Sequence, residues 1–194
     1  MLRTLIHNWW LFACRAALAL TFAAYLWLIE GAKLPPLMLA FANASVVALF
    51  GILAFGAGLL TFAAILRPSN KGHHRGLLLV DGIGSCVAAV IVVLTPSLAL
   101  GHLITIIAVW AIFAGLCQLL LAFDLERHLR EEWLLLVAGL GSVGFGIILL
   151  EKWTMSEQDL IVSLTWYSFF SAAVMGGIGF GLWSAGRRHS ANTI

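Results

Sequence analysis

The feature that most constrains this chain is a run, residues 82–123, without a single Asp, Glu, Lys or Arg. Crossing a hydrocarbon core of about 30 Å takes roughly 20 residues of helix. The run is therefore long enough to cross a membrane twice. Thr95-Pro96-Ser97 interrupts it, and proline does not continue a helix that precedes it. The run predicts two membrane-spanning helices with a turn between them.

The whole chain follows the same pattern. Its 194 residues are 62% hydrophobic and 10% charged, with a mean hydropathy of +1.02, whereas soluble domains are about 25% charged. A soluble fold is excluded. We predict an all-α, polytopic membrane protein in which residues 1–194 form a single integral membrane domain. Its six transmembrane helices are expected at 9–29, 37–66, 77–94, 98–123, 133–150 and 160–185.

Orientation follows from the lysines and arginines between the predicted spans, because connections rich in them stay in the cytoplasm. Only Lys33 and Lys152 lie on one side of the predicted bundle. The other side includes both termini, so we expect both termini to be cytoplasmic. Its basic residues are Arg3, Arg67, Lys71, Arg75, Arg127, Arg130, Arg187 and Arg188.

The odd-numbered spans repeat one pattern. Residues 76–85 (GLLLVDGIGS) match residues 133–142 (WLLLVAGLGS) at an offset of 57, and the first span fits more loosely at an offset of 66. The even spans show a weaker similarity, in which residues 51–56 align with residues 110–115. The pattern predicts three helical hairpins, about 1–67, 68–127 and 128–194. They are parallel rather than inverted repeats, because each begins on the same side.

Small residues recur at helix-packing spacing in the last two spans. Ala138, Ser142 and Gly146 form one such stripe, and Gly177 with Gly181 forms another. Such stripes let helix backbones approach closely in lipid. They predict a tight bundle, and they also offer faces through which copies of the chain associate as a homo-oligomer. A glycine-lined permeation path is the alternative interpretation.

Arg15 and Asp81 are the only charged residues inside the predicted spans. In the repeat register Arg15 lies on Asp81, which places both about 7 to 8 Å below the cytoplasmic interface. A charge inside a bilayer costs several kcal/mol unless it snorkels, pairs or meets water. We therefore predict a candidate intramembrane ion pair. Structural pairing, separate solvation, and a proton or ion relay remain open as its role.

A second set of candidate residues lies at the outer ends of the spans. Carboxylates and histidine take up protons on acidification, so this set gains positive charge when the outside becomes acidic. These are candidate pH-sensing residues, although a single histidine near a helix end also has a plain interfacial interpretation. The set comprises His102, Glu30, Glu151, Glu157 and Asp159.

Motifs for chemistry are missing from the sequence. It contains no GxSxG, HExxH, Walker or Rossmann pattern, and its three cysteines show no spacing typical of a metal site. We therefore expect no enzyme activity, no catalytic residues, no cofactor and no metal. The basic residues form no long run, so no nucleic acid is expected as a partner. The lipid bilayer is the predicted environment.

Several short motifs together resemble the HdeD family of small bacterial inner-membrane proteins. They are Trp9-Trp10 followed by Arg15 in the first span, Asp81-Gly82 in the third and Gly139-Leu140-Gly141 in the fifth. The resemblance covers essentially the whole chain. It implies six transmembrane helices, a bacterial inner (plasma) membrane location, no known cofactor and a part in acid resistance.

Two functions follow as hypotheses. The first is a non-enzymatic, HdeD-like inner-membrane protein that acts in acid or envelope stress tolerance. The second is a transporter or channel for protons or a small solute, with Arg15 and Asp81 along the path. A transporter should have a polar cavity near the middle of the membrane and broken helices. A structural stress protein should have a packed core of Gly, Ala and Leu.

Overall fold

The computed structural model describes residues 9–32, 36–66, 74–94, 100–124, 132–152 and 155–191. Each of these ranges holds one long helix, and each helix contains a stretch long and apolar enough to cross a membrane. The predicted all-α class with six membrane-spanning helices is confirmed. The helices are α2 (Trp9–Gly31), α3 (Pro36–Leu66), α4 (His74–Leu94), α5 (Leu100–Asp124), α6 (Glu132–Glu151) and α7 (Glu157–Ala191).

The apolar side chains of these helices face both inward and outward. Only 22% to 44% of the most apolar window of each span is buried inside the protein. Large side chains such as Leu20, Ile52, Val109 and Phe180 are more than half exposed. Lipid accepts such surfaces, and helices satisfy their own backbone hydrogen bonds where no water is present. The protein is therefore a multi-pass membrane protein.

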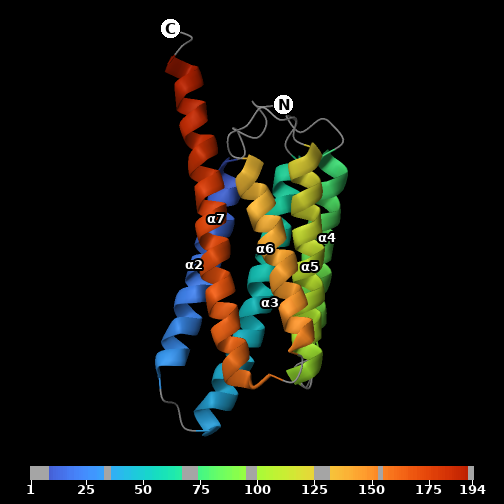
Figure 1. Ribbon diagram of the computed structural model, residues 1–194, viewed down its shortest axis with the longest axis vertical. Helices are drawn as coiled ribbons and strands as arrows, with labels where there is room; N and C mark the ends of the chain where they lie inside the picture. The colour runs from blue at the N-terminus through green and yellow to red at the C-terminus, as the bar shows by residue number, and fades with distance from the viewer. Residues whose placement is uncertain are drawn as a thin grey trace.

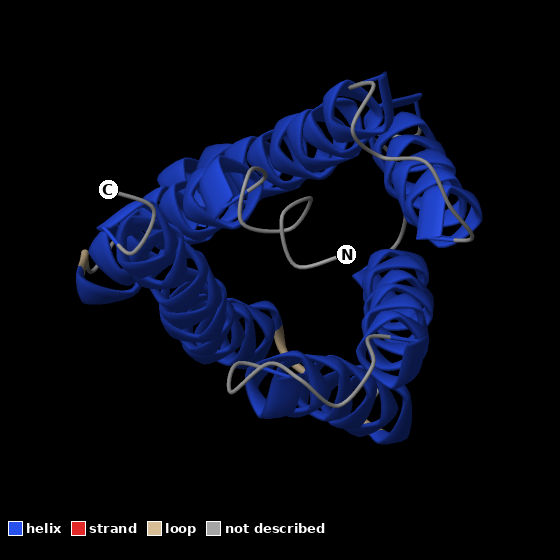
Figure 2. Ribbon diagram, turned by 90° about the horizontal axis from the view of Figure 1, so that it is seen from above, coloured by secondary structure: helices blue, strands red, loops and turns tan. Residues whose placement is uncertain are grey.

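The six helices run up and down and close into a three-sided ring (Figures 1 and 2). Each helix packs against the helices before and after it in the chain, and α7 packs against α2 to complete the ring. The most extensive packing joins α3 to α4, α5 to α6 and α7 to α2. We call these three contacts the seams. They connect consecutive hairpins, whereas the two helices within a hairpin touch less.

Glycines allow the close approach at two seams. A Cβ atom on Gly115 of α5 would lie only 2.7 Å from the carbonyl oxygen of Gly139 in α6. A Cβ atom on Gly58 of α3 would lie 3.0 Å from the carbonyl oxygen of Gly82 in α4. Gly115 and Gly139 each lie 57 residues after their counterparts Gly58 and Gly82. These two seams are therefore the same structural unit.

This equivalence corrects one detail of the predicted repeat. The sequence comparison placed residues 51–56 over 110–115, an offset of 59, which puts Gly56 on Gly115. The structure instead gives Gly58 the role of Gly115, at the offset of 57 that the odd spans already showed. Several small residues of α3 fit a short apolar pattern equally well, so the pattern alone does not distinguish Gly56 from Gly58.

Contacts within the hairpins also repeat. The ring of Phe113 in α5 occupies the space where Gly84 of α4 lacks a side chain, and the ring of Phe170 in α7 does the same over Gly141 of α6. Both residues of the second pair follow the first by 57. In the first hairpin the large and small residues are exchanged between the two helices. The large residue, Leu18, is on the first helix, α2, and it lies against the glycine of the second helix, Gly56 of α3.

The predicted small-residue stripes pack inside the chain. A Cβ atom on Gly146 would lie 2.7 Å from the carbonyl oxygen of Ala108 in α5, and Gly177 faces Leu134 of α6. Ala138 and Ser142 are buried. These faces therefore contribute to a tight bundle within one chain. Association between copies stays a prediction.

Candidate functional site

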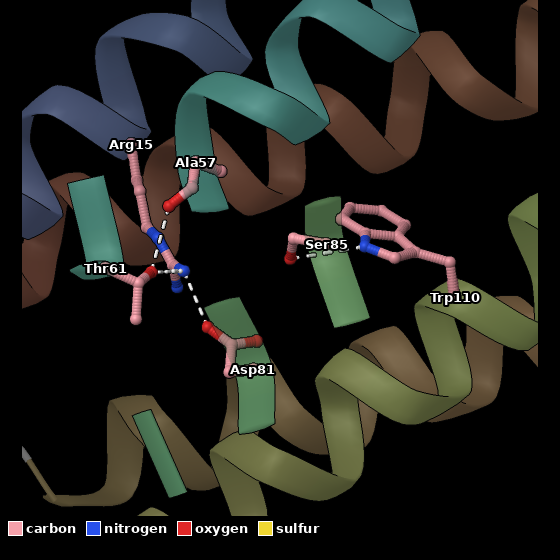
Figure 3. A network of polar contacts seen from close by, with 6 residues as sticks. All are labelled: Arg15, Ala57, Thr61, Asp81, Ser85 and Trp110. Atoms are coloured by element: carbon pink, nitrogen blue, oxygen red, sulfur yellow. Dashed lines mark hydrogen bonds and ion pairs between the residues drawn. The ribbon is translucent and has the colours of Figure 1, made fainter. Parts of the chain in front are cut away.

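Arg15 and Asp81 meet inside the bundle, where α2, α3 and α4 come together (Figure 3). The Nη2 atom of Arg15 lies 2.6 Å from Oδ2 of Asp81, and the two side chains are 16% and 10% exposed. Nη2 also donates to the hydroxyl of Thr61 at 2.6 Å. Thr61 in turn donates to the carbonyl of Ala57, one turn earlier in its own helix, at 2.9 Å. The ion pair joins α2 to α4, and Thr61 connects it to a third helix, α3.

The seam between α3 and α4 positions this network. Gly58 and Gly82 bring the two backbones together, and a Cβ atom on Gly82 would lie 3.5 Å from Cβ of Thr61. Asp81 precedes Gly82, and Thr61 follows Gly58 by about one turn, so both point to the same region. Thr61 was not found from the sequence. A lone threonine in an apolar helix carries no charge or motif that would distinguish it.

Two further polar contacts occupy equivalent places in the second and third hairpins. Trp110 Nε1 makes a long, 3.5 Å contact with the hydroxyl of Ser85 (Figure 3), and the hydroxyls of Ser142 and Tyr167 are 3.0 Å apart. Ser85 and Ser142 are 57 residues apart, and so are Trp110 and Tyr167. The matching of Ser85 with Ser142 was visible in the odd-span repeat. Their aromatic partners become visible only when the same offset is applied to the even spans.

Two cavities lie on the inner side of the ring. The larger has a volume of about 120 Å³, and the smaller about 30 Å³. Four residues line both cavities, namely Arg15, Asp81, Gln118 and Met175. We call these four the axial layer. Other residues of α2 that line the larger cavity follow Arg15, whereas those that line the smaller cavity precede it, so the layer separates the two.

The axial layer is electrically neutral but incompletely hydrogen-bonded. Asp81 balances the charge of Arg15 at contact distance. Arg15 Nε and Gln118 Oε1 are both buried, and neither has a hydrogen-bond partner among the residues that the structure describes. Buried polar atoms are normally paired, with protein or with a bound molecule.

The candidate outer residues lie at the opposite end of the helices from the start of α2. Glu30, His102, Glu151 and Asp159 are all exposed. Asp159 accepts a hydrogen bond from the Ser156 hydroxyl at 2.7 Å, while its backbone N–H donates to that hydroxyl at 3.2 Å, which caps the start of α7. The side chain of Glu157 lies outside the described residues. The structure brings the set to one end of the bundle, and its part in pH sensing stays a prediction.

A metal centre is not formed by the described parts of the chain. No three histidine, cysteine, aspartate or glutamate side chains come together there as a metal ion would require.

Comparison with known families agrees with the repeated structure. A family described as a short repeat of unknown function (DUF308) matches residues 37–94 and again residues 80–151, which together span more than half of the chain. The chain belongs to the DUF308 family. This family includes HdeD-like membrane proteins, so the resemblance seen in the sequence holds at the family level. No curated protein and no solved structure matches the chain.

Proposed function

We propose that this DUF308 protein is a non-enzymatic protein of the bacterial inner membrane that acts in tolerance of acid or envelope stress. The observation that carries the proposal is the arrangement of the interior. The two intramembrane charges, Arg15 and Asp81, join three helices at contact distance, and glycines pack the backbones of neighbouring hairpins closely together. Membership of a family that includes HdeD-like proteins adds support.

The proposed topology has both termini in the cytoplasm. It is supported by the excess of lysine and arginine on that side of the bundle. Six spans also place the start of α2 and the end of α7 at the same end (Figure 1). Reporter fusions after Arg75, Arg130 and Arg188 should all behave as cytoplasmic. A periplasmic signal from any of them would overturn this topology.

The stress function is tested in a deletion strain. Cells without the protein should survive exposure to low pH less well than the parent, and expression of the wild-type chain should restore survival. Equal survival of the two strains, in acid and under envelope-damaging conditions, would refute the proposed function.

The outer residues are tested in the same strain. A variant in which His102 and the four outer carboxylates are replaced by uncharged residues should restore survival only in part, if protonation of that surface contributes. Full restoration would remove the outer surface from the mechanism while leaving the stress function intact.

One observation favours transport as a second candidate function. The axial layer lies between two cavities on the inner side of the ring, as a closed barrier in a proton or small-solute path would. The helices, however, run unbroken through the described ranges, whereas transporter sites are typically formed by broken helices.

Proton flux across liposome membranes tests the transport candidate. If the path exists, wild-type protein should collapse an imposed pH gradient faster than protein-free liposomes do, and Asp81→Asn should slow the collapse. Identical rates with and without protein would reject proton transport, and a panel of labelled solutes extends the test to other cargo.

A further inference from the structure

The larger cavity lies at the centre of the molecule, and equivalent positions of the repeat line it. Leu53, Trp110 and Tyr167 follow one another at the offset of 57, and all three contribute to its wall. All three hairpins therefore enclose the same space. Such a cavity is a consequence of the ring, in which the helices pack most closely at the seams and less closely toward the axis.

The wall of this cavity has two chemical characters. Helices α2 and α3 contribute the rings of Phe22 and Phe50. Helix α7 contributes the hydroxyls of Ser168 and Ser171, and α5 contributes the amide of Gln118. A cavity with apolar walls and a few polar groups is typical of a small-molecule site.

The unpaired atoms of the axial layer define the hydrogen bonds that a ligand would make. Arg15 Nε is a donor without an acceptor, and Gln118 Oε1 is an acceptor without a donor, among the described residues. Both residues line the cavity. A molecule that carries an acceptor and a donor would satisfy both.

Charge and size limit the ligand further. Asp81 already neutralises Arg15, so a charged ligand would enter the membrane interior without a counter-charge, which is unfavourable. The volume of about 120 Å³ is close to that of a cavity of roughly 150 Å³ that admits benzene. The ligand must therefore be uncharged and have only a few heavy atoms.

We infer that the cavity is a binding site for a small uncharged molecule with both a hydrogen-bond acceptor and a donor, of the chemical class of primary carboxamides and undissociated carboxylic acids. The acceptor takes the bond from Arg15 Nε, the donor serves Gln118 Oε1, and the apolar part lies against Phe22 and Phe50. The site is independent of both proposed functions, because binding requires neither transport nor a stress response.

Propionamide is a suitable probe, because it has both groups and stays uncharged at all relevant pH values. The full chain, with methyl-labelled alanine, is placed in nanodiscs and titrated by NMR. The methyl signals of Ala57 and Ala114, which line the cavity, should shift in a saturable manner. The signal of Ala24, which is exposed on α2, should not. Butanone, which lacks the donor, should bind about tenfold more weakly, the effect of one hydrogen bond.

Variants locate the site. Gln118→Leu should weaken propionamide binding about tenfold, whereas Gln158→Leu, the same change at an exposed position of α7, should leave it unchanged. Ser171→Leu should fill the cavity and abolish binding, and it replaces Gln118→Leu as the deciding variant if that chain does not fold.

Three results would overturn the inference. The first is no saturable shift at Ala57 or Ala114, which would mean that the cavity holds only water. The second is equal binding of butanone and propionamide, which would reject the proposed donor. The third is unchanged binding in Ser171→Leu, which would place the probe elsewhere.

Discussion

The seams and the axis of this ring are built from the same repeat but in opposite ways. At the seams, glycines place backbone against backbone, and a Cβ atom on Gly115 would lie 2.7 Å from a carbonyl oxygen. At the axis, the same helices leave about 120 Å³ of space and two buried polar atoms that have no partner among the described residues. Close packing between hairpins therefore holds the ring together. Because the seams supply this packing, the centre of the ring can contain polar groups and an unfilled cavity.

The axis also differs between repeats, whereas two of the three seams match. Gly58 with Gly82 and Gly115 with Gly139 make matching contacts. At the axis, Arg15 and Asp81 occupy equivalent places in the first two hairpins, whereas the third has Ala138. The repeat is thus kept where backbones touch and altered where polar groups meet.

The largest effect is expected from breaking the ion pair at the axis. Removing one partner of a buried pair costs about 3–5 kcal/mol, because the other charge is left unpaired. Asp81→Ala and Arg15→Ala should both approach the lower end, since both side chains keep slight exposure. Asp81→Ala should cost the less of the two, because Arg15 then keeps its bond to Thr61. Folded yield and thermal unfolding in detergent measure the loss.

The exchanged pair sharpens this prediction. Arg15→Asp combined with Asp81→Arg should recover part of the lost stability, because opposite charges again face each other across α2 and α4. A double variant no more stable than the worse single variant would show that orientation in the network, rather than charge pairing, holds the three helices together.

The seam should respond next. Gly115→Ala introduces a methyl group against the backbone of α6, and overpacking of this kind costs about 1–3 kcal/mol. Gly144→Ala is the matched control, because a Cβ atom there meets nothing within 4 Å. The control should be as stable as the wild type or slightly more so, since alanine favours helix. Equal behaviour of the two variants in thermal unfolding would contradict the proposed role of the seams.

A smaller effect is expected from the polar contact of the third hairpin. Tyr167→Phe removes the hydroxyl that lies 3.0 Å from Ser142 but keeps the ring that stacks on Phe145 at 4.1 Å. The loss should be about 1 kcal/mol, the net value of one hydrogen bond. Unfolding in a denaturant series measures it, and a loss as large as that of Gly115→Ala would mean that the axis contributes to assembly as much as the seams.

The smallest effect is expected at the outer end. His102 is exposed, so His102→Gln should change stability by less than about 0.5 kcal/mol at neutral pH. A clear loss in thermal unfolding would show that the outer end takes part in the packing of the bundle, and the contrast between seams and axis would then be incomplete.

The helix boundaries show which parts of a helix hydropathy predicts correctly. The expected spans at 9–29 and 133–150 lie within α2 and α6 and end within two residues of each terminus. The last span was expected at 160–185, but α7 continues from Glu157 to Ala191. Its final turns carry Arg187, which lies over the ring of Trp183 at 4.2 Å. Hydropathy detects the part of a helix that lies in lipid and not its polar continuation.

The candidate site was predictable only in part. Charge inside an apolar segment is costly and therefore conspicuous, so Arg15 and Asp81 stood out, and the repeat register placed them at equal depth. Thr61 and Tyr167 did not stand out, because uncharged polar residues are tolerated in membrane helices and become meaningful only beside a partner. The unpaired atom of Gln118 likewise depends on what its neighbours leave unsatisfied.

Six membrane-spanning helices in three parallel hairpins follow from the residues alone, because lipid requires long apolar helices and the internal repeat is visible in the chain. The closest helix contacts, the reach of Arg15 to both Asp81 and Thr61, and the cavity at the centre do not follow from the residues and emerge only when the helices pack. Those features depend on how three imperfect copies of one hairpin close into a ring. Closure depends on how closely the helices fit at the seams. Each seam is formed by helices of two different hairpins, so no single segment of the sequence contains it.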